Sequence, residues 1–173
     1  MQIDISMLDG PQLKSSHAFS EYDLYICVDN MVSDNPLYRS EKLHEDYMEL
    51  YYPASFAERI DLEDWTGMAG LPFISIIERN YFLYQRVLSL MEKHCYAPLK
   101  IHHTTSIESI LYMVNAGLGI TILPAGSCAG NQYPGILSQS IRDEEALLLM
   151  MVSWKEEAGN RALHNFAAML RAQ

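Results

Sequence analysis

The segment formed by residues 104–124 constrains the fold of this 173-residue chain more than any other part of the sequence. Residues 105–108 read Thr-Ser-Ile-Glu, a capping box in which the threonine accepts from a backbone amide while the glutamate reaches back. Apolar residues then recur at helical spacing, at Ile107, Ile110, Leu111 and Val114. Gly117 supplies the left-handed residue that ends many helices, and residues 119–124 form an apolar run typical of a buried strand. The segment therefore predicts a helix, a tight turn and a strand.

Predicted strands and helices alternate along the rest of the chain. Apolar or alternating runs predict strands at residues 2–7, 22–28, 47–52, 71–77, 136–141 and 146–154. Helical patterns fall at residues 13–20, 81–94 and 161–171, the last with Asn160 as its N-cap. The mostly apolar strand 22–28 is expected to be covered on both faces. This alternation predicts an α/β fold with a largely parallel sheet.

Charge and composition exclude several classes of protein. Twelve Lys and Arg against 22 Asp and Glu give a formal net charge of −10, which opposes binding to nucleic-acid phosphates or anionic lipid. The longest apolar run, residues 146–152, is too short to cross a bilayer, and the first residues lack the pattern of a signal peptide. The three cysteines have no C-x-x-C spacing, so they indicate neither a disulfide framework nor a zinc site. We expect a soluble cytoplasmic chain that does not contact a membrane.

The most enzyme-like pattern is a G-x-C-x-G at residues 126–130, which contains Cys128 and is followed along the chain by Asp143 and His164. A nucleophilic cysteine at such a turn needs a helix directly after it to lower the thiol pKa. Residues 131–135 read Asn-Gln-Tyr-Pro-Gly, a poor start for a helix, and His164 falls within a helical pattern. We therefore expect a non-enzymatic protein and keep a Cys128-dependent hydrolase as an alternative.

Metal and cofactor sites are not expected. On an extended segment His102 and His103 point to opposite faces, so they do not readily chelate one metal ion, and the neighbours His94 and Cys95 have the same defect. A group of aromatic residues near a helix start is consistent either with the wall of a ligand pocket or with ordinary packing. These residues are Tyr81, Phe82 and Tyr84.

A cluster of hydroxyl residues at Thr104, Thr105 and Ser106 is a candidate anion site. Hydroxyls and free backbone amides at a helix N-terminus suit a carboxylate or a similar group. Ligands of open α/β sheets bind at the carboxyl ends of strands, so the helix start and the end of the strand 71–77 are expected to meet at one crevice. An ordinary helix cap without a ligand explains the same residues, and the pattern alone leaves both interpretations open.

Residues 104–124 closely resemble the effector-domain signature of LysR-type transcriptional regulators. In that signature a hydroxyl-rich helix start leads to V-x-x-G-x-G-I-x-x-x-P, matched here by Val114, Gly117, Gly119, Ile120 and Pro124. Gly10 with Asp-Leu-Tyr-Ile at residues 23–26, and Leu-Pro-Phe-Ile at residues 71–74, are weaker matches in the family's order. The resemblance covers nearly the whole chain.

The resemblance implies a type 2 periplasmic-binding-protein-like fold with two Rossmann-like lobes, a two-strand hinge and a cleft between the lobes. Lobe I would comprise residues 1–71 and 141–173, lobe II residues 72–140, and the hinge residues 72–75 and 136–140. The first strand and helix of lobe I, and the DNA-binding winged helix-turn-helix before them, are expected to be missing from this chain.

By the same resemblance, the ligand contacts two short segments, namely Ser75, Ile76, Ile77 and Glu78, and Thr104, Thr105 and Ser106. The implied function is an effector-sensing and oligomerisation domain that binds a small, anionic coinducer and forms a homodimer or tetramer. DNA would be contacted only through the missing head. Peroxide-sensing relatives carry a reactive cysteine where this chain has Phe82, so Cys95 is not expected to sense peroxide. A solute-binding receptor of the same fold is the alternative, against which the lack of a signal peptide weighs.

Overall fold

The computed structural model describes residues 22–28, 38–76, 82–128, 133–155 and 161–171. The chain divides into two compact units, Met1–Glu45 with Leu148–Gln173 (unit 1) and Asp46–Leu147 (unit 2). It passes between them within strand β2 (Tyr38–Pro53) and at the start of strand β7 (Leu147–Lys155). Residues 72–75 and 136–140, expected from the resemblance to form the hinge, both belong to unit 2.

Unit 1 is built on β7. Strand β1 (Leu24–Val28) pairs antiparallel with β7, and β7 lies beside β2, where the hydroxyls of Ser40 and Ser153 share a 2.7 Å hydrogen bond. Helix α5 (Arg161–Arg171) has the bounds predicted from its apolar stripe. Its buried Ala167 packs with Val152 and Trp154. The predicted cap Asn160, strand 2–7 and helix 13–20 lie outside the described residues.

Strand β1 is buried on one face rather than on both. Tyr25 and Cys27 are buried, whereas Ile26 between them is 50% exposed. The prediction of a strand covered on both faces is therefore wrong. Its side chains alternate between two environments, and only one of these is core.

Unit 2 contains the helix, turn and strand predicted from residues 104–124. Helix α4 (Ile107–Asn115) ends before Gly117, which has φ of 76°, and strand β5 (Thr121–Pro124) follows. The predicted apolar stripe of α4 is confirmed, because it enters a buried cluster with residues from four other segments. That cluster consists of Ile110, Leu111, Val114, Tyr51, Ile74, Leu123 and Tyr133.

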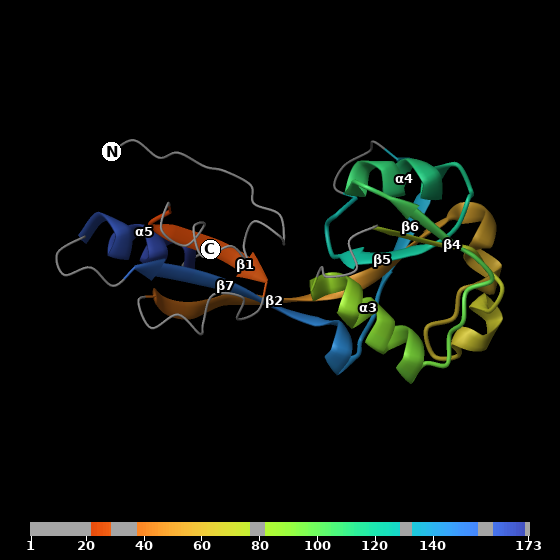
Figure 1. Ribbon diagram of the computed structural model, residues 1–173, viewed down its shortest axis with the longest axis horizontal. Coiled ribbons are helices and arrows are strands. Elements are labelled where there is room, and N and C mark those ends of the chain that lie inside the picture. The colour runs from red at the N-terminus through yellow and green to blue at the C-terminus, as the bar shows by residue number, and fades with distance from the viewer. Residues whose placement is uncertain (1–21, 29–37, 77–81, 129–132, 156–160, 172–173) are drawn as a thin grey trace. The chain divides into compact units, whose positions relative to one another are not determined.

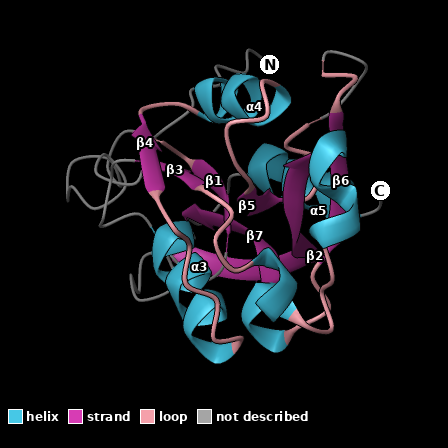
Figure 2. Cartoon of the chain, turned by 90° about the vertical axis from the view of Figure 1, so that its right-hand side faces the viewer, coloured by secondary structure: helices cyan, strands magenta, loops and turns pink. Residues whose placement is uncertain are grey.

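Two further strands complete the part of unit 2 that concerns function. Strand β3 (Phe73–Ile76) pairs in parallel with β4 (Ile101–Thr104), and Ile120 forms a parallel bridge to Phe73 just before β5. Helix α3 (Phe82–Lys93) and helix α4 lie on opposite sides of these strands (Figure 1, Figure 2). Short 3-10 helices occupy Ala54–Arg59, Trp65–Met68 and Glu144–Ala146.

The larger sheet does not have the predicted parallel character. Its strand order is β1-β7-β2-β5, with β6 (Ile136–Ser140) also paired to β2. The pairs β1–β7, β2–β5 and β2–β6 are all antiparallel. Strands β3 and β4 pair in parallel, and Ile120 forms a parallel bridge to Phe73. The prediction of a largely parallel sheet is wrong, because β5 and β6 both pair antiparallel with the long strand β2.

Candidate functional site

The carboxyl ends of β3 and β4 lie side by side in unit 2. Their parallel register places Ser75 opposite His103 and Ile76 opposite Thr104. Thr104 leads directly into the start of α4, so the structure brings the two predicted segments together at one edge. Ile77 and Glu78, the remaining residues of the first segment, lie outside the described residues.

The cap of α4 is Ser106, one residue later than predicted. Ser106 has extended backbone angles, φ −141° and ψ 155°, and its hydroxyl oxygen accepts from the amide of Ser109 over 3.2 Å. The same hydroxyl donates to the Ser109 hydroxyl over 3.1 Å. The predicted capping box of Thr105 with Glu108 is therefore wrong, because the helix begins at Ile107. Thr105 is an exposed residue outside the cap.

Loss of the cap is expected to affect stability, whereas loss of the neighbouring threonine is not. Ser106→Ala removes the acceptor of the Ser109 amide, and we expect it to lower the free energy of unfolding by about 1 kcal/mol. Thr105→Ala removes an exposed hydroxyl and should change that energy by less than about 0.5 kcal/mol. Urea unfolding of both variants tests this difference. Equal losses would contradict the assignment of Ser106 as the cap.

A small cavity of about 60 Å³ adjoins this edge within unit 2. Ser75 and Ile76 at the end of β3 line it, together with Ile107 at the start of α4 and Pro124 at the end of β5. Tyr84 on α3 also lines it, whereas Tyr81 and the side chain of Phe82, the other two aromatic residues singled out in the sequence, lie outside the described part of the structure. The cavity thus shares Ser75 and Ile76 with the predicted ligand segments.

The walls of this cavity are apolar apart from hydroxyl groups. Thr121 donates its hydroxyl to the carbonyl of Ile74 over 2.8 Å, which satisfies that group internally. Ser75 is 6% exposed, and its hydroxyl donates over 3.4 Å to the carbonyl of Ile76, a long hydrogen bond. No Asp, Glu, Lys, Arg or His is found among the described residues that line the cavity. Any charge on a ligand would have to be met outside it.

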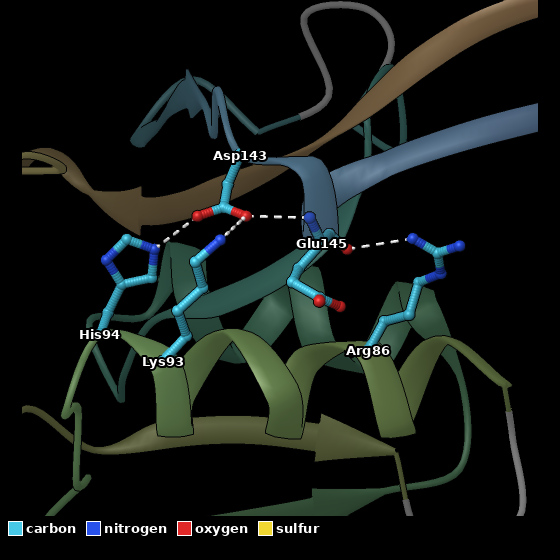
Figure 3. A network of polar contacts seen from close by, with 5 residues as sticks. All are labelled: Arg86, Lys93, His94, Asp143 and Glu145. Carbon is cyan, nitrogen blue, oxygen red and sulfur yellow. Dashed lines mark hydrogen bonds and ion pairs between the residues drawn. The ribbon is translucent and has the colours of Figure 1, made fainter.

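A polar network at the other end of α3 was missed by sequence reasoning (Figure 3). The Asp143 carboxylate accepts from Lys93 over 2.8 Å and from the Glu145 amide over 2.9 Å, and its second oxygen lies 3.0 Å from Nε2 of His94. Arg86, also on α3, donates to the carbonyls of Glu145 and Leu147 over 3.1 and 2.8 Å. Together these contacts fasten α3 to the turn that leads into β7.

The network changes the pKa of Asp143. Burial on its own would raise the pKa of this carboxyl, but hydrogen bonds from Lys93, the Glu145 amide and His94 outweigh burial and hold it below its ordinary value. A carboxyl with a lowered pKa stabilises the fold above about pH 4, and that contribution is lost as the pH falls through the lowered pKa.

We therefore expect Asp143→Asn to lower stability at pH 7 and to weaken the acid dependence. Urea midpoints of the parent chain and of Asp143→Asn should differ most above about pH 4 and converge toward pH 2. Glu92→Gln, an exposed carboxylate on the same helix, serves as the control. A midpoint difference between the parent chain and Asp143→Asn that stays constant across this pH range would refute the prediction.

Cys128 and Asp143 do not have the properties that the hydrolase alternative requires of them. Burial, with a smaller contribution from the Glu49 carboxylate, raises the pKa of the Cys128 thiol, the opposite of what a nucleophilic cysteine requires. Asp143 is engaged by Lys93 and His94. The side chain of His164 lies outside the described part of the structure. Cys128 lines a second, more open cavity of about 250 Å³ with Tyr51 and Tyr133.

Metal-binding groups and membrane-spanning helices can be assessed for the described residues. Within these residues, no group of three His, Cys, Asp or Glu side chains is placed to hold a metal ion. None of the described helices is long and apolar enough to span a membrane.

Comparisons with known proteins connect this geometry to a family. A family model described as the LysR substrate binding domain matches residues 1–173. The HTH-type transcriptional regulator GltR of Bacillus subtilis (strain 168) is 25% identical over 172 residues, which cover 98% of this chain and 56% of GltR. The chain thus spans little more than half the length of that relative.

Solved structures show the same fold. The effector-binding domain of a BenM variant matches with a TM-score of 0.73 and 14% identity, over 95% of this chain and 77% of the BenM chain. The BenM effector-binding domain with its effector benzoate matches with a TM-score of 0.69 and 16% identity, over 89% and 70% of the two chains. The predicted type 2 periplasmic-binding-protein-like α/β fold is therefore confirmed.

Proposed function

This chain belongs to the LysR substrate-binding domain family, and on that basis we propose that it is the effector-sensing part of a LysR-type transcriptional regulator. The effector is a small anionic metabolite. It binds at the carboxyl ends of β3 and β4, against Ser75, Ile76 and the helix start at Thr104, Thr105 and Ser106. Ile77 and Glu78 complete the proposed site.

One observation is the main support for the proposed location of the effector site. The parallel register sets Ile76 beside Thr104, so the end of one strand and the start of α4 form a single edge. Backbone amides at a helix N-terminus attract anions, and the exposed Thr105 hydroxyl is not consumed by the cap. The cavity beside this edge offers room next to the same residues.

The output of binding is a shift between arrangements of the regulator. A ligand that prefers one arrangement raises its population by its differential affinity. DNA is contacted by another part of the regulator, because the net charge of −10 opposes contact by this chain. GltR supports a separate DNA-binding part, because it is named an HTH-type transcriptional regulator and this chain aligns with 56% of its length. Such a regulator works in the cytoplasm, where it reaches DNA.

Self-association into a dimer or tetramer is part of the proposal. Unit 2 exposes several apolar side chains, and exposed apolar surface is characteristic of protein interfaces. These include Leu88 on α3 and Leu99 and Ile101 at β4, which are 37%, 78% and 39% exposed. The two lobes, divided at residues 72–75 and 136–140, remain a prediction from the family resemblance.

A thermal-unfolding titration against small carboxylates tests the function. A ligand at about 100 times its Kd should stabilise the folded chain by roughly 2.7 kcal/mol, a clear rise in the midpoint. Thr105→Ala should abolish most of that rise while leaving the ligand-free midpoint unchanged, since Thr105 lies outside the cap. Tyr112→Ala, 66% exposed on the same helix, is the matched control. An equal rise in Thr105→Ala would exclude this threonine from the site.

A further inference from the structure

The cavity beside the proposed site lets us infer the chemical class of the effector, and this inference rests on the proposed function. We propose that the effector is a monocarboxylate with an apolar tail, and that the cavity between α3, α4 and the strand ends receives the tail. A short branched chain or a single ring fits this description. Effectors that carry a second charge on the tail are rejected.

The cavity lies directly beside the proposed anion site. It begins at Ser75 and Ile76, which border the proposed anion site, and its wall continues through Ile107. Ile107 is the first residue of α4, directly after the cap Ser106. A ligand whose carboxylate lies at the helix start therefore has the cavity next to it.

The wall of the cavity is mostly apolar. Tyr84, Val87 and Ile107 face the cavity from the two helices, and Leu123 and Pro124 face it from β5. No described residue that lines it carries a formal charge. An unpaired carboxylate in such surroundings loses its hydration without a compensating partner, which is costly. A methyl or ring carbon gains from leaving water at the same place.

The hydroxyl groups in the wall do not compensate a charge on the tail. Thr121 already donates its hydroxyl proton to the carbonyl of Ile74, so it has no proton to donate to a carboxylate on the tail. Among the described residues, the Ser75 hydroxyl is paired only through the long 3.4 Å hydrogen bond to the carbonyl of Ile76. The neutral hydroxyls of Ser75 and Tyr84 can each meet a weakly polar atom of the ligand, but they do not neutralise a carboxylate.

The test compares matched acids on the full 173-residue chain by isothermal titration calorimetry. The pairs are pentanoate with pentanedioate and phenylacetate with 4-carboxyphenylacetate, which differ by a carboxylate at the far end of the tail. We expect at least one monoacid to bind, with a Kd at least tenfold lower than that of its diacid. Equal or tighter binding of the diacids would overturn the proposed class.

Two variants connect the result to the cavity. Ile107→Thr places a hydroxyl in the wall and should raise the Kd of the monoacid at least fivefold, whereas Ile101→Thr, the same change on β4 outside the cavity, should leave it unchanged. Tyr84→Gln tests the opposite wall on α3, independently of α4. If both cavity variants bind the monoacid like the parent chain, the tail lies elsewhere and the inference is wrong.

The outcomes separate the inference from the proposed function. Diacid binding that is lost in Thr105→Ala but unaffected by Ile107→Thr would keep the anion site and overturn the apolar class. Binding of a monoacid that is unaffected by Thr105→Ala, Ile107→Thr and Tyr84→Gln would overturn both. Absence of binding by all four acids, in a chain with a cooperative unfolding transition, would also count against both.

Discussion

Gly119→Ala is expected to destabilise the chain by about 2 to 3 kcal/mol, because no space exists for a β-carbon at this position. An added β-carbon would lie 2.5 Å from the carbonyl oxygen of Pro72 and 3.1 Å from a side-chain carbon of Ile74. The backbone cannot move away cheaply. The next residue, Ile120, donates to that Pro72 carbonyl over 2.9 Å and accepts from the Ile74 amide over 2.8 Å.

Gly117 is the comparison position, because its backbone conformation favours glycine there, whereas at Gly119 the lack of space does. Its φ of 76° lies in the left-handed region, but a β-carbon there would meet no atom within 4 Å. Gly117→Ala should cost about 1 kcal/mol from backbone strain, and Gly117→Asn less, since asparagine tolerates this conformation. Gly119→Asn should be at least as harmful as Gly119→Ala. Urea unfolding of the four variants tests this, and equal effects at both positions would contradict the close approach at Gly119.

Trp154→Ala is expected to lower the free energy of unfolding by about 3 to 5 kcal/mol. The Trp154 side chain on β7 is 2% exposed and packs with Val152 and with Ala167 of α5. The guanidinium of Arg39 also lies 5.8 Å from the centre of the indole ring. Removal of the ring leaves a cavity that these neighbours fill only in part.

The two tryptophans of the chain allow the effect to be followed in each unit. Trp154 lies in unit 1 and Trp65 in unit 2, so in Trp154→Ala the remaining fluorescence reports on unit 2 while circular dichroism reports on the whole chain. Met169→Ala, 66% exposed on α5, is the control and should change stability by less than about 0.5 kcal/mol. A loss below about 1 kcal/mol for Trp154→Ala would show that the indole is not part of the core.

Local signals explain why α4 was predicted well. Gly117 and the apolar stripe act within one helix, so their meaning depends little on the rest of the chain. The cap was misplaced by one residue because Thr105 and Ser106 are both good cap residues. The backbone is extended at Ser106 and helical from Ile107, so Ser106 is the cap.

The first half of strand β2 could not be predicted from the sequence. Only residues 47–52 were predicted to be a strand, yet β2 begins at Tyr38. Its first half is polar and partly exposed, and it is held by β7, with Ser40 bonded to Ser153 from 113 residues away. Pairing at such a separation leaves no pattern in the strand itself.

The candidate site was predicted in part. The meeting of β3 with the start of α4 follows from a general property of α/β sheets, and the register of Ile76 with Thr104 agrees with it. The contacts of Asp143 with Lys93 and His94 were not predicted, because they join residues 50 and 49 positions apart through side chains alone. The sequence pattern indicates Asp143 only as a candidate catalytic partner of Cys128 and His164.

The most direct test of the proposed effector site is to map the bound ligand by NMR. In the 19.7 kDa chain, amide shifts are followed during titration with the tightest-binding acid of the calorimetric series. We expect the largest changes at Ser75, Ile76 and the amides of residues 104–107, with saturation at the calorimetric Kd. Changes centred on Tyr51, Cys128 and Tyr133, which line the second cavity, would contradict the proposed site.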